Sequence, residues 1–413
     1  MDKKIKVLMV NKFFYIKGGS ETYLFALKKL LAEGGVETID FSMKDRKNFA
    51  SNYSDYFIEN IDYSEKNIFK KFLYASKIIY NFESYKKMKK LLEDTNPDIV
   101  HLHLFQHQIS PSIIKAIKEK HIPIVYTVHD LKPVCLNYKM LNSKGICEEC
   151  KGGKYLKCLK NKCVKESYIF SFINVLEGYL HNFLKSYKNI DMFITPSDFY
   201  RNKLLENGFL KDRVINIDNF IDTSKFKPNY SNENYFVYVG RLSNEKGVKT
   251  LIEAMKDVKE STLKIVGSGP IEEELKSFSK LYKIKNIEFL GFKSQREVRD
   301  IVAKSKFMII PSEWYENGPM SVLEAMAMGK AIIGANIGGI PEMVNHNING
   351  YLFESGNKEE LAKYINKLLQ NDKDIINFGK ESRKIMENKY SEKVHYNKIM
   401  KVYNRVLKNG ING

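Results

Sequence analysis

Two glutamates separated by seven residues, Glu316 and Glu324, form the first candidate site of this 413-residue chain. Glu316 lies in the loop after an apolar run, 307–312, that we predict to be a buried strand, and Glu324 lies inside the helix predicted from a run of good helix formers, 321–328. In a parallel α/β sheet such loops gather at the carboxyl ends of the strands, where ligands bind. The two carboxylates are therefore placed to accept hydrogen bonds from hydroxyl groups.

A second candidate site pairs an arginine with a lysine. Arg241 and Lys246 lie in a glycine-flanked loop after the predicted strand 235–239. Arginine binds phosphate through a bidentate fork, and lysine binds it as a point charge. The loop therefore has the composition of a diphosphate clamp.

The first predicted strand, 5–10, precedes another glycine loop, Gly18-Gly19, and a helix predicted over 22–32. Glycines let the backbone approach a phosphate closely, and the N–H groups at a helix start attract anions. Strand, glycine loop and helix together are typical of the first βα unit of a nucleotide-binding fold.

Histidines follow two of the predicted strands of the first half. His129 and Asp130 lie at the end of the strand 124–128, and His101, His103 and His107 cluster earlier in the chain. No carboxylate or cysteine at ligand spacing completes a metal set with the cluster. We expect those three histidines to pack or to contact substrate.

All five cysteines fall within a lysine- and glycine-rich segment, 135–163. Cys147, Cys150, Cys158 and Cys163 can supply four thiolates to a structural zinc ion, although the second pair is spaced more widely than in the commonest zinc ribbon. A reduced, flexible insertion and an iron–sulfur cluster are the alternatives. Because the segment follows His129, we expect it on the acceptor side of the site.

The rest of the chain must position these residues. The formal net charge of +18 favours anionic partners, namely nucleotide diphosphates, acidic membrane surfaces or nucleic acid. A basic helix predicted over 68–92 is typical either of a membrane-surface helix or of a packed helix with a solvated lysine face. The apolar start is too short for a signal peptide, and no run is apolar enough for a membrane span. We therefore expect a cytoplasmic protein, with the inner face of the membrane as a candidate peripheral contact.

The sequence around the glutamates, Pro-Ser-Glu followed by Leu-Glu-Ala-Met-Ala-Met-Gly, and the later Ile-Gly-Gly-Ile-Pro-Glu resemble the signature of family 4 glycosyltransferases. The loop Gly-Arg-x4-Lys-Gly resembles the diphosphate clamp of the same family. The resemblance implies the GT-B fold, which is α/β with two doubly wound Rossmann-like domains facing a cleft. It also implies an acceptor-side domain over 1–216, a donor-binding domain over 217–390 and a helix over 391–413 that returns to the first domain.

The resemblance further implies a retaining transfer of a sugar from a nucleotide-diphosphate sugar to a glycan or lipid-linked acceptor, without a catalytic metal. The catalytic residues would be His129, Arg241, Lys246 and Glu316, and Asp130 would orient the imidazole or the acceptor. The donor would be bound by Gly18, Gly19, Gly240, Gly267, Phe292, Asn317, Gly318, Pro319, Met320 and Glu324. Pro319 is a departure, because it has no N–H to offer the sugar.

Two alternatives come from other classes. A sugar-nucleotide 2-epimerase shares the fold, and a zinc-containing nucleic-acid-binding protein would explain the charge and the cysteines. The glutamate motif argues against the first, and two doubly wound halves with phosphate loops argue against the second. A nicotinamide-dependent enzyme is disfavoured because no Gly-x-Gly-x-x-Gly follows the first strand. We therefore expect no nucleic-acid partner.

Overall fold

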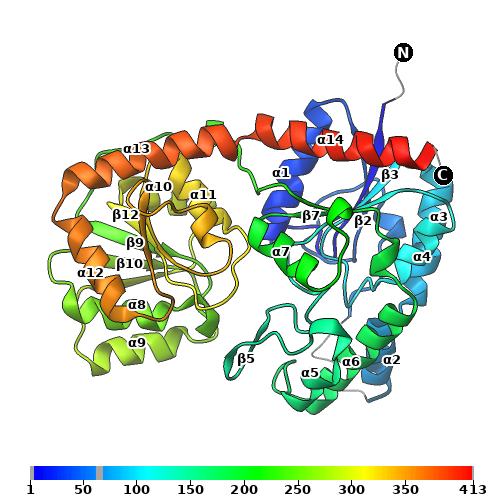
Figure 1. Ribbon diagram of the computed structural model, residues 1–413, viewed down its shortest axis with the longest axis horizontal. Helices are drawn as coiled ribbons and strands as arrows, with labels where there is room; N and C mark the ends of the chain where they lie inside the picture. Colours follow the sequence, from blue (N-terminus) through cyan, green and yellow to red (C-terminus); the bar gives the residue numbers. More distant parts are fainter. Residues whose placement is uncertain (1–3, 62–67, 412–413) are drawn as a thin grey trace. The chain divides into compact units, whose positions relative to one another are not determined.

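The computed structural model describes residues 4–61 and 68–411, without side-chain detail at 68–72 and 409–411. These residues form two units, each a parallel sheet with helices packed around it (Figure 1). Unit 1 runs to Ile217 and takes up the chain again from Tyr396, and unit 2 is Asp218–His395.

Unit 1 is built on a six-stranded sheet of order β2-β1-β3-β4-β7-β8. Its central strands are short apolar runs that are buried on both faces, as expected where helices cover a parallel sheet. The strands are β1 (Lys6–Val10), β2 (Glu37–Phe41), β3 (Ile99–Leu102), β4 (Ile124–Thr127), β7 (Met192–Thr195) and β8 (Val214–Asn216).

The helices of unit 1 join these parallel strands. They are α1 (Gly19–Glu33), α2 (Ile68–Ile79), α3 (Phe82–Thr95), α4 (Ser112–Lys118), α5 (Leu156–Lys160), α6 (Tyr168–Phe183) and α7 (Asp198–Glu206). The long connection from β4 to β7 contains the cysteine segment, with a small hairpin of β5 (Leu141–Asn142) and β6 (Gly145–Ile146), and then α5 and α6.

Unit 2 repeats the architecture with a sheet of order β11-β10-β9-β12-β13-β14, which confirms the prediction of two doubly wound halves. Its strands are β9 (Tyr235–Val239), β10 (Thr262–Val266), β11 (Ile287–Gly291), β12 (Phe307–Ile310), β13 (Ala331–Ala335) and β14 (Gly350–Phe353). Its helices are α8 (Val248–Ala254), α9 (Glu272–Leu281), α10 (Gln295–Lys304), α11 (Met320–Ala327), α12 (Lys358–Leu369) and α13 (Asp372–Lys389).

The last helix, α14 (Glu392–Ile411), starts in unit 2 and continues in unit 1. In unit 1 its Tyr403 is fully buried and its hydroxyl lies 2.7 Å from Nδ1 of His101 on β3. Its Tyr396 hydroxyl donates to the Gly34 carbonyl at 3.2 Å. The end of the chain is thus part of the packing of unit 1.

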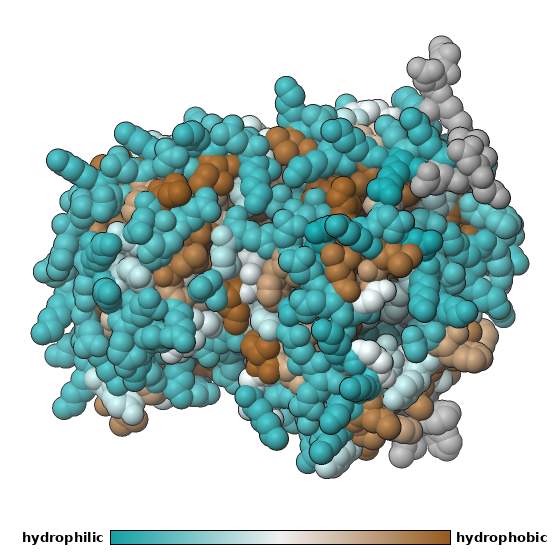
Figure 2. Space-filling view, in the orientation of Figure 1, coloured by the Kyte–Doolittle hydropathy of each residue, from teal (hydrophilic) through white to brown (hydrophobic). Residues whose placement is uncertain are grey.

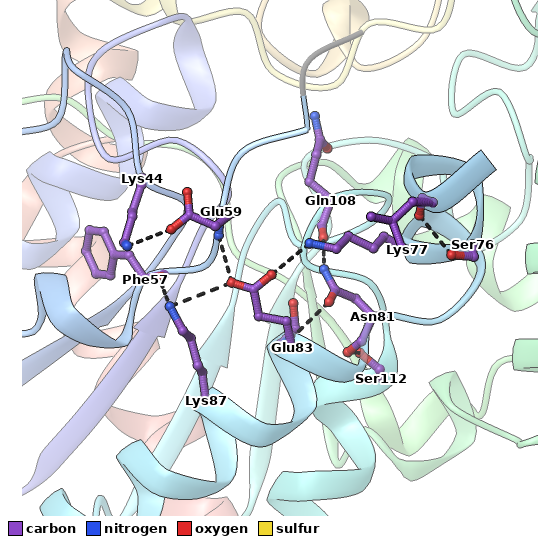
Figure 3. A network of polar contacts seen from close by, with 12 residues as sticks. Lys44, Phe57, Glu59, Ser76, Lys77, Asn81, Glu83, Lys87, Gln108 and Ser112 are labelled. Atoms are coloured by element: carbon purple, nitrogen blue, oxygen red, sulfur yellow. Dashed lines mark hydrogen bonds and ion pairs between the residues drawn. The ribbon is translucent and has the colours of Figure 1, made fainter. Parts of the chain in front are cut away.

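The prediction of a single basic helix over 68–92 is wrong, because the first helix, α2, ends at Ile79 and a second helix, α3, begins at Phe82. Asn81 is fully buried at the break, where its side chain accepts from the Ser84 N–H and donates to the Gln108 carbonyl. This N-cap starts α3 afresh. Figure 3 shows Glu83 beside it, bonded to Lys77 of α2 and to the Glu59 N–H.

The glycines after β13 lead into a three-residue 3-10 turn, Ile340–Glu342. Among the described residues, no helix combines the length and apolar character that crossing a membrane requires.

Candidate functional site

Two loops at the carboxyl ends of neighbouring strands meet in unit 2. The loop after β9 ends at Gly247, whose φ is +64° and where an added Cβ would lie 1.8 Å from the Pro311 carbonyl oxygen. The N–H of Glu313 donates to the Glu245 carbonyl at 2.9 Å, so the loops after β9 and β12 touch through their backbones. Only glycine fits both the conformation and the contact at position 247.

Lys246 and Glu316 face each other across this contact. Nζ of Lys246 lies 2.7 Å from Oε1 of Glu316, and the Ser312 hydroxyl donates to the same oxygen at 2.6 Å. Burial opposes ionisation of Glu316, but the Lys246 charge and these hydrogen bonds outweigh it and lower the pKa of Glu316. The carboxylate is therefore ionised and fixed in place.

The loop after β13 also contacts Glu316, through the backbone carbonyl of this residue. The N–H of Gly339 donates to the Glu316 carbonyl at 2.8 Å. Gly338 has a φ of +60°, and a Cβ there would lie 2.5 Å from the same carbonyl oxygen. The Gly-Gly motif after β13 thus has a packing role in holding the first glutamate.

The second glutamate lies on α11. Burial raises the pKa of Glu324 to about 7, and the charge of Arg299 on α10 partly opposes this rise. The helix begins at Met320 after Pro319, and the Gly318 carbonyl accepts from the Asn219 side chain at 2.8 Å. A half-buried acid that titrates near neutral pH is suited to accepting hydroxyl hydrogen bonds from a ligand.

The other residues of unit 2 that were predicted to bind the sugar donor follow strands along the same edge of the sheet. Gly240 follows β9, Gly267 follows β10 and Phe292 follows β11, three strands that are neighbours in the sheet. Arg241 is exposed, and Phe292 is 81% exposed. Asn317 lies in the loop between Glu316 and Gly318 and is half-buried.

In unit 1 the glycine loop leads into α1. Gly18 is the N-cap residue with an extended backbone, and it and Gly19 are exposed. A Cβ on Gly18 would meet nothing closer than Oε2 of Glu21, at 3.7 Å. The folded chain itself therefore does not require glycine at position 18.

His129 lies at the carboxyl end of β4, as predicted, with its Nε2 3.0 Å from Nδ1 of His103. Burial lowers the pKa of His129 to about 3 and lowers the pKa of His103 well below its usual value. Both rings are neutral at physiological pH, so one donates and the other accepts. The edge of the Tyr23 ring packs on His129, with the ring centres 5.2 Å apart.

His103 was not recognised from the sequence as a partner of His129, and Asp130 was expected to orient either the imidazole or the acceptor. Oδ1 of Asp130 accepts from the Lys132 N–H at 3.1 Å. A signal was available in the sequence, because alternate residues of a strand share one face and His101 and His103 are two apart. His101 contacts Tyr403 and Thr127 within the core, so of the two roles expected for it, packing or substrate contact, these contacts fit packing.

The five cysteines lie around one cavity of about 10 Å³, room for about one small atom. Burial raises the pKa of Cys150 to about 12 and that of Cys135 to about 11. Within residues 4–61 and 68–411, no group of three or more His, Cys, Asp or Glu side chains is arranged to hold a metal ion. Burial thus favours the protonated thiol at Cys135 and Cys150, whereas a hydrogen bond with Cys158 lowers the pKa of Cys163.

Comparison with known proteins agrees with this geometry. The family described as Glycosyltransferase Family 4 matches residues 17–225, and the one described as Glycosyl transferases group 1 matches residues 220–389. An uncharacterised glycosyltransferase of Methanocaldococcus jannaschii is 27% identical over 97% of this chain and 98% of its own. The amylovoran biosynthesis glycosyltransferase AmsK of Erwinia amylovora is 23% identical over 56% of this chain and 61% of its own.

Among solved structures, Anabaena HepE in complex with UDP-glucose superposes with a TM-score of 0.65 at 17% identity, over 97% of this chain and all of its own. The two parallel sheets and this likeness define a two-domain α/β protein of the GT-B type. The chain belongs to glycosyltransferase family 4 and is a glycosyltransferase. Neither the epimerase nor the nucleic-acid-binding alternative receives support from these comparisons.

The glycines of the two units lead to a matched prediction on stability. Gly247→Ala should lower the melting temperature strongly, because it places a Cβ against the Pro311 carbonyl at a positive φ. Gly18→Ala should leave the melting temperature unchanged, because its backbone is extended and its surroundings are open. Differential scanning calorimetry of both variants checks this, and equal melting temperatures for the two would contradict it.

Proposed function

We propose that this glycosyltransferase transfers a sugar, with retention of anomeric configuration, from a nucleotide-diphosphate sugar bound by unit 2. The observation that carries the proposal is the fixed pair of Lys246 and Glu316, with the exposed Arg241 in the same loop as Lys246. Cations bind the diphosphate and a carboxylate binds sugar hydroxyls, so the two parts of such a donor have matched partners. HepE, which binds UDP-glucose, supports this class of donor.

In this proposal Arg241 and Lys246 stabilise the charge that develops on the leaving diphosphate. Preorganised cations of this kind act without a metal ion. Lys246 already neutralises Glu316, so the donor phosphate would share this ammonium with the carboxylate, and Arg241 would add an unshared charge. The loops with Gly240, Gly267, Asn317, Gly318, Pro319 and Met320 would close around the donor, with Phe292 beside the nucleobase.

Retention of configuration is proposed to occur on one face of the sugar. The leaving phosphate would help deprotonate the acceptor, and no side chain is assigned as a covalent nucleophile. Glu316 suits this scheme, because a carboxylate already held by an ammonium and a hydroxyl is a poor nucleophile. Neutral His129, positioned by His103, would contact the transferred sugar, while Gly18 and Gly19 would approach the diphosphate and acceptor.

The acceptor is proposed to be a glycan or lipid-linked sugar of an envelope polysaccharide, bound by unit 1 on the cytoplasmic side. The name of AmsK supports a role in polysaccharide synthesis. A cavity of about 620 Å³ in unit 1 lies between the cysteine segment, α6 and β7. Its wall combines aromatic and aliphatic side chains with Lys132, Lys185, Lys188 and Arg213, so an amphipathic anion would fit its chemistry.

The clearest mutational test is Arg241→Ala, because this side chain is exposed and its loss should not disturb folding. We expect kcat to fall by about 100-fold or more, about 3 kcal/mol, the scale of losing one preorganised donor. The control is Lys249→Ala, which removes the same charge from an exposed site on α8. Full activity of a folded Arg241→Ala enzyme would contradict the proposed clamp.

Metal removal tests the catalytic and structural parts of the proposal separately. Transfer should continue at an unchanged rate in short assays with excess EDTA, because protein cations replace the metal. A rapid loss of activity that Mg²⁺ or Mn²⁺ restores would refute this.

Zinc binding by Cys147, Cys150, Cys158 and Cys163 stays a prediction of the sequence, and elemental analysis should find close to one equivalent of zinc. Metal-free protein with five titratable thiols would overturn it.

The pH dependence of donor binding tests Glu324. Its pKa of about 7 means that the carboxylate is mostly protonated at pH 6 and mostly ionised at pH 8. If Glu324 accepts hydrogen bonds from the ribose hydroxyls, the affinity of the enzyme for the donor is full above pH 7. This affinity falls as the pH drops through 7, by up to roughly tenfold per pH unit. Calorimetry with UDP-glucose, or with the nucleotide sugar that most raises the melting temperature, measures this.

The control for that experiment is Glu324→Gln, which cannot titrate. Its affinity should be low and independent of pH between 6 and 8. The same pH slope in the wild type and in Glu324→Gln would assign the titration to another group and remove Glu324 from the ribose site.

A further inference from the structure

Helix α6 presents its polar side chains to the protein interior. Ser171, Asn174, Glu177 and His181 follow helical spacing, and all are at most 5% exposed. Nζ of Lys132 donates to Oδ1 of Asn174 at 2.9 Å and to Oε2 of Glu177 at 2.8 Å. His181 binds the Ser186 hydroxyl and the Ile79 carbonyl. The buried face of this helix is therefore mainly polar, with Val175 as an apolar member. Most of its polar atoms have partners, while Oε1 of Glu177 has no hydrogen-bond partner among the described residues.

The opposite face of α6 is apolar and exposed. At 100° per residue, its side chains lie on the side away from the buried polar stripe. They are Ile169 (72% exposed), Phe172 (49%), Leu176 (40%), Tyr179 (41%) and Phe183 (82%). A surface helix of a water-soluble domain has the reverse arrangement, with its apolar stripe against the core.

Neighbouring helices extend this apolar surface. α6 packs against α2 and α5. On these helices and beside them, Leu73 is 53% exposed, Phe82 is 69% exposed and Leu156 is 61% exposed. In Figure 2 brown side chains gather at the lower edge of unit 1, where Figure 1 places α2, α5 and α6. We call this surface, defined by Leu73, Phe82, Leu156 and the five residues of α6, the α6 surface.

The segment that contains α5 and α6 is rich in lysine. Between residues 151 and 188 the chain has eight lysines and two acids, Glu166 and the buried Glu177. The eight lysines are all exposed: Lys151, Lys154, Lys157, Lys160, Lys162, Lys165, Lys185 and Lys188. The ammonium groups of Lys162 and Lys165 lie 4.5 and 4.9 Å from the ring centres of Tyr168 and Phe170. Two aromatic side chains at the start of α6 thus each have an ammonium group beside them.

We propose that the α6 surface docks unit 1 on an anionic lipid bilayer. Apolar side chains enter the boundary between headgroups and acyl chains, while lysines bind lipid phosphates. The exposed lysines of this segment decide between occupants, because a second copy of the chain would place its own lysines against those of the first. Docking goes beyond the proposed transfer and does not depend on its site residues. It would bring the 620 Å³ cavity, whose wall includes the inner face of α6, close to a lipid-anchored acceptor.

The test is flotation of the full chain with vesicles of phosphatidylcholine containing about 30 mol% phosphatidylglycerol. The wild type should float with these vesicles, should bind pure phosphatidylcholine weakly, and should be released as salt rises. Ile169→Ser/Phe183→Ser should lower partitioning roughly tenfold or more. The matched control, Leu281→Ser/Ile348→Ser, changes two exposed apolar residues of unit 2, 75% and 52% exposed, and should float as the wild type does.

Failure to float of the wild type, or equal flotation of the two double variants, would overturn the proposal. A wild-type dimer in light scattering that Ile169→Ser/Phe183→Ser converts to a monomer would also overturn it, because the occupant would then be a second copy. Calorimetry with the nucleotide sugar, measured on the same samples, keeps the two proposals apart. Donor binding should be unchanged in the double variant, and its loss would mean that unfolding rather than lost docking explains the result.

Discussion

The ion pair between the half-buried Lys246 and the buried Glu316 is the interaction on which the ligand-binding edge of unit 2 depends. It joins the loops that follow β9 and β12, two neighbouring strands of the sheet. Removing Lys246 would leave the buried carboxylate of Glu316 without its counter-charge, which is unfavourable. The two loops are therefore held in one arrangement before any ligand arrives, as electrostatic preorganisation requires.

Glycines make this arrangement sterically feasible. Gly247 lets the first loop touch Pro311, and Gly338 lets the loop after β13 support the Glu316 carbonyl. Glycines that look like phosphate-binding motifs in the sequence can thus have a packing role instead. Gly18 is the opposite case, because no contact within the folded chain requires glycine there.

Most of the fold could be predicted from the sequence, since each central strand is an apolar run flanked by glycine loops and amphipathic helices. The order of the strands and the contact of His103 with His129 could not, because they depend on which segments pack together. The break at Asn81 was missed for the same reason, since its hydrogen-bond partner Gln108 is 27 residues away in sequence. The residues of the proposed donor site were chosen by resemblance, and the structure adds the contact between Lys246 and Glu316.

The orientation of α6 rests on a second buried lysine–glutamate pair, Lys132 and Glu177, each with 3% of its side chain exposed. Rolling the helix over would bury Ile169, Phe172 and Phe183, a gain of about 1.5–3 kcal/mol for each side chain. It would also break the ion pair, at about 3–5 kcal/mol. The lost hydrogen bonds of Asn174 and His181 would cost about 1–3 kcal/mol each. The free energy gained and the free energy lost are comparable, so the buried polar contacts of α6 can keep its apolar side chains facing outward. Contact of those side chains with a lipid bilayer would favour this orientation further.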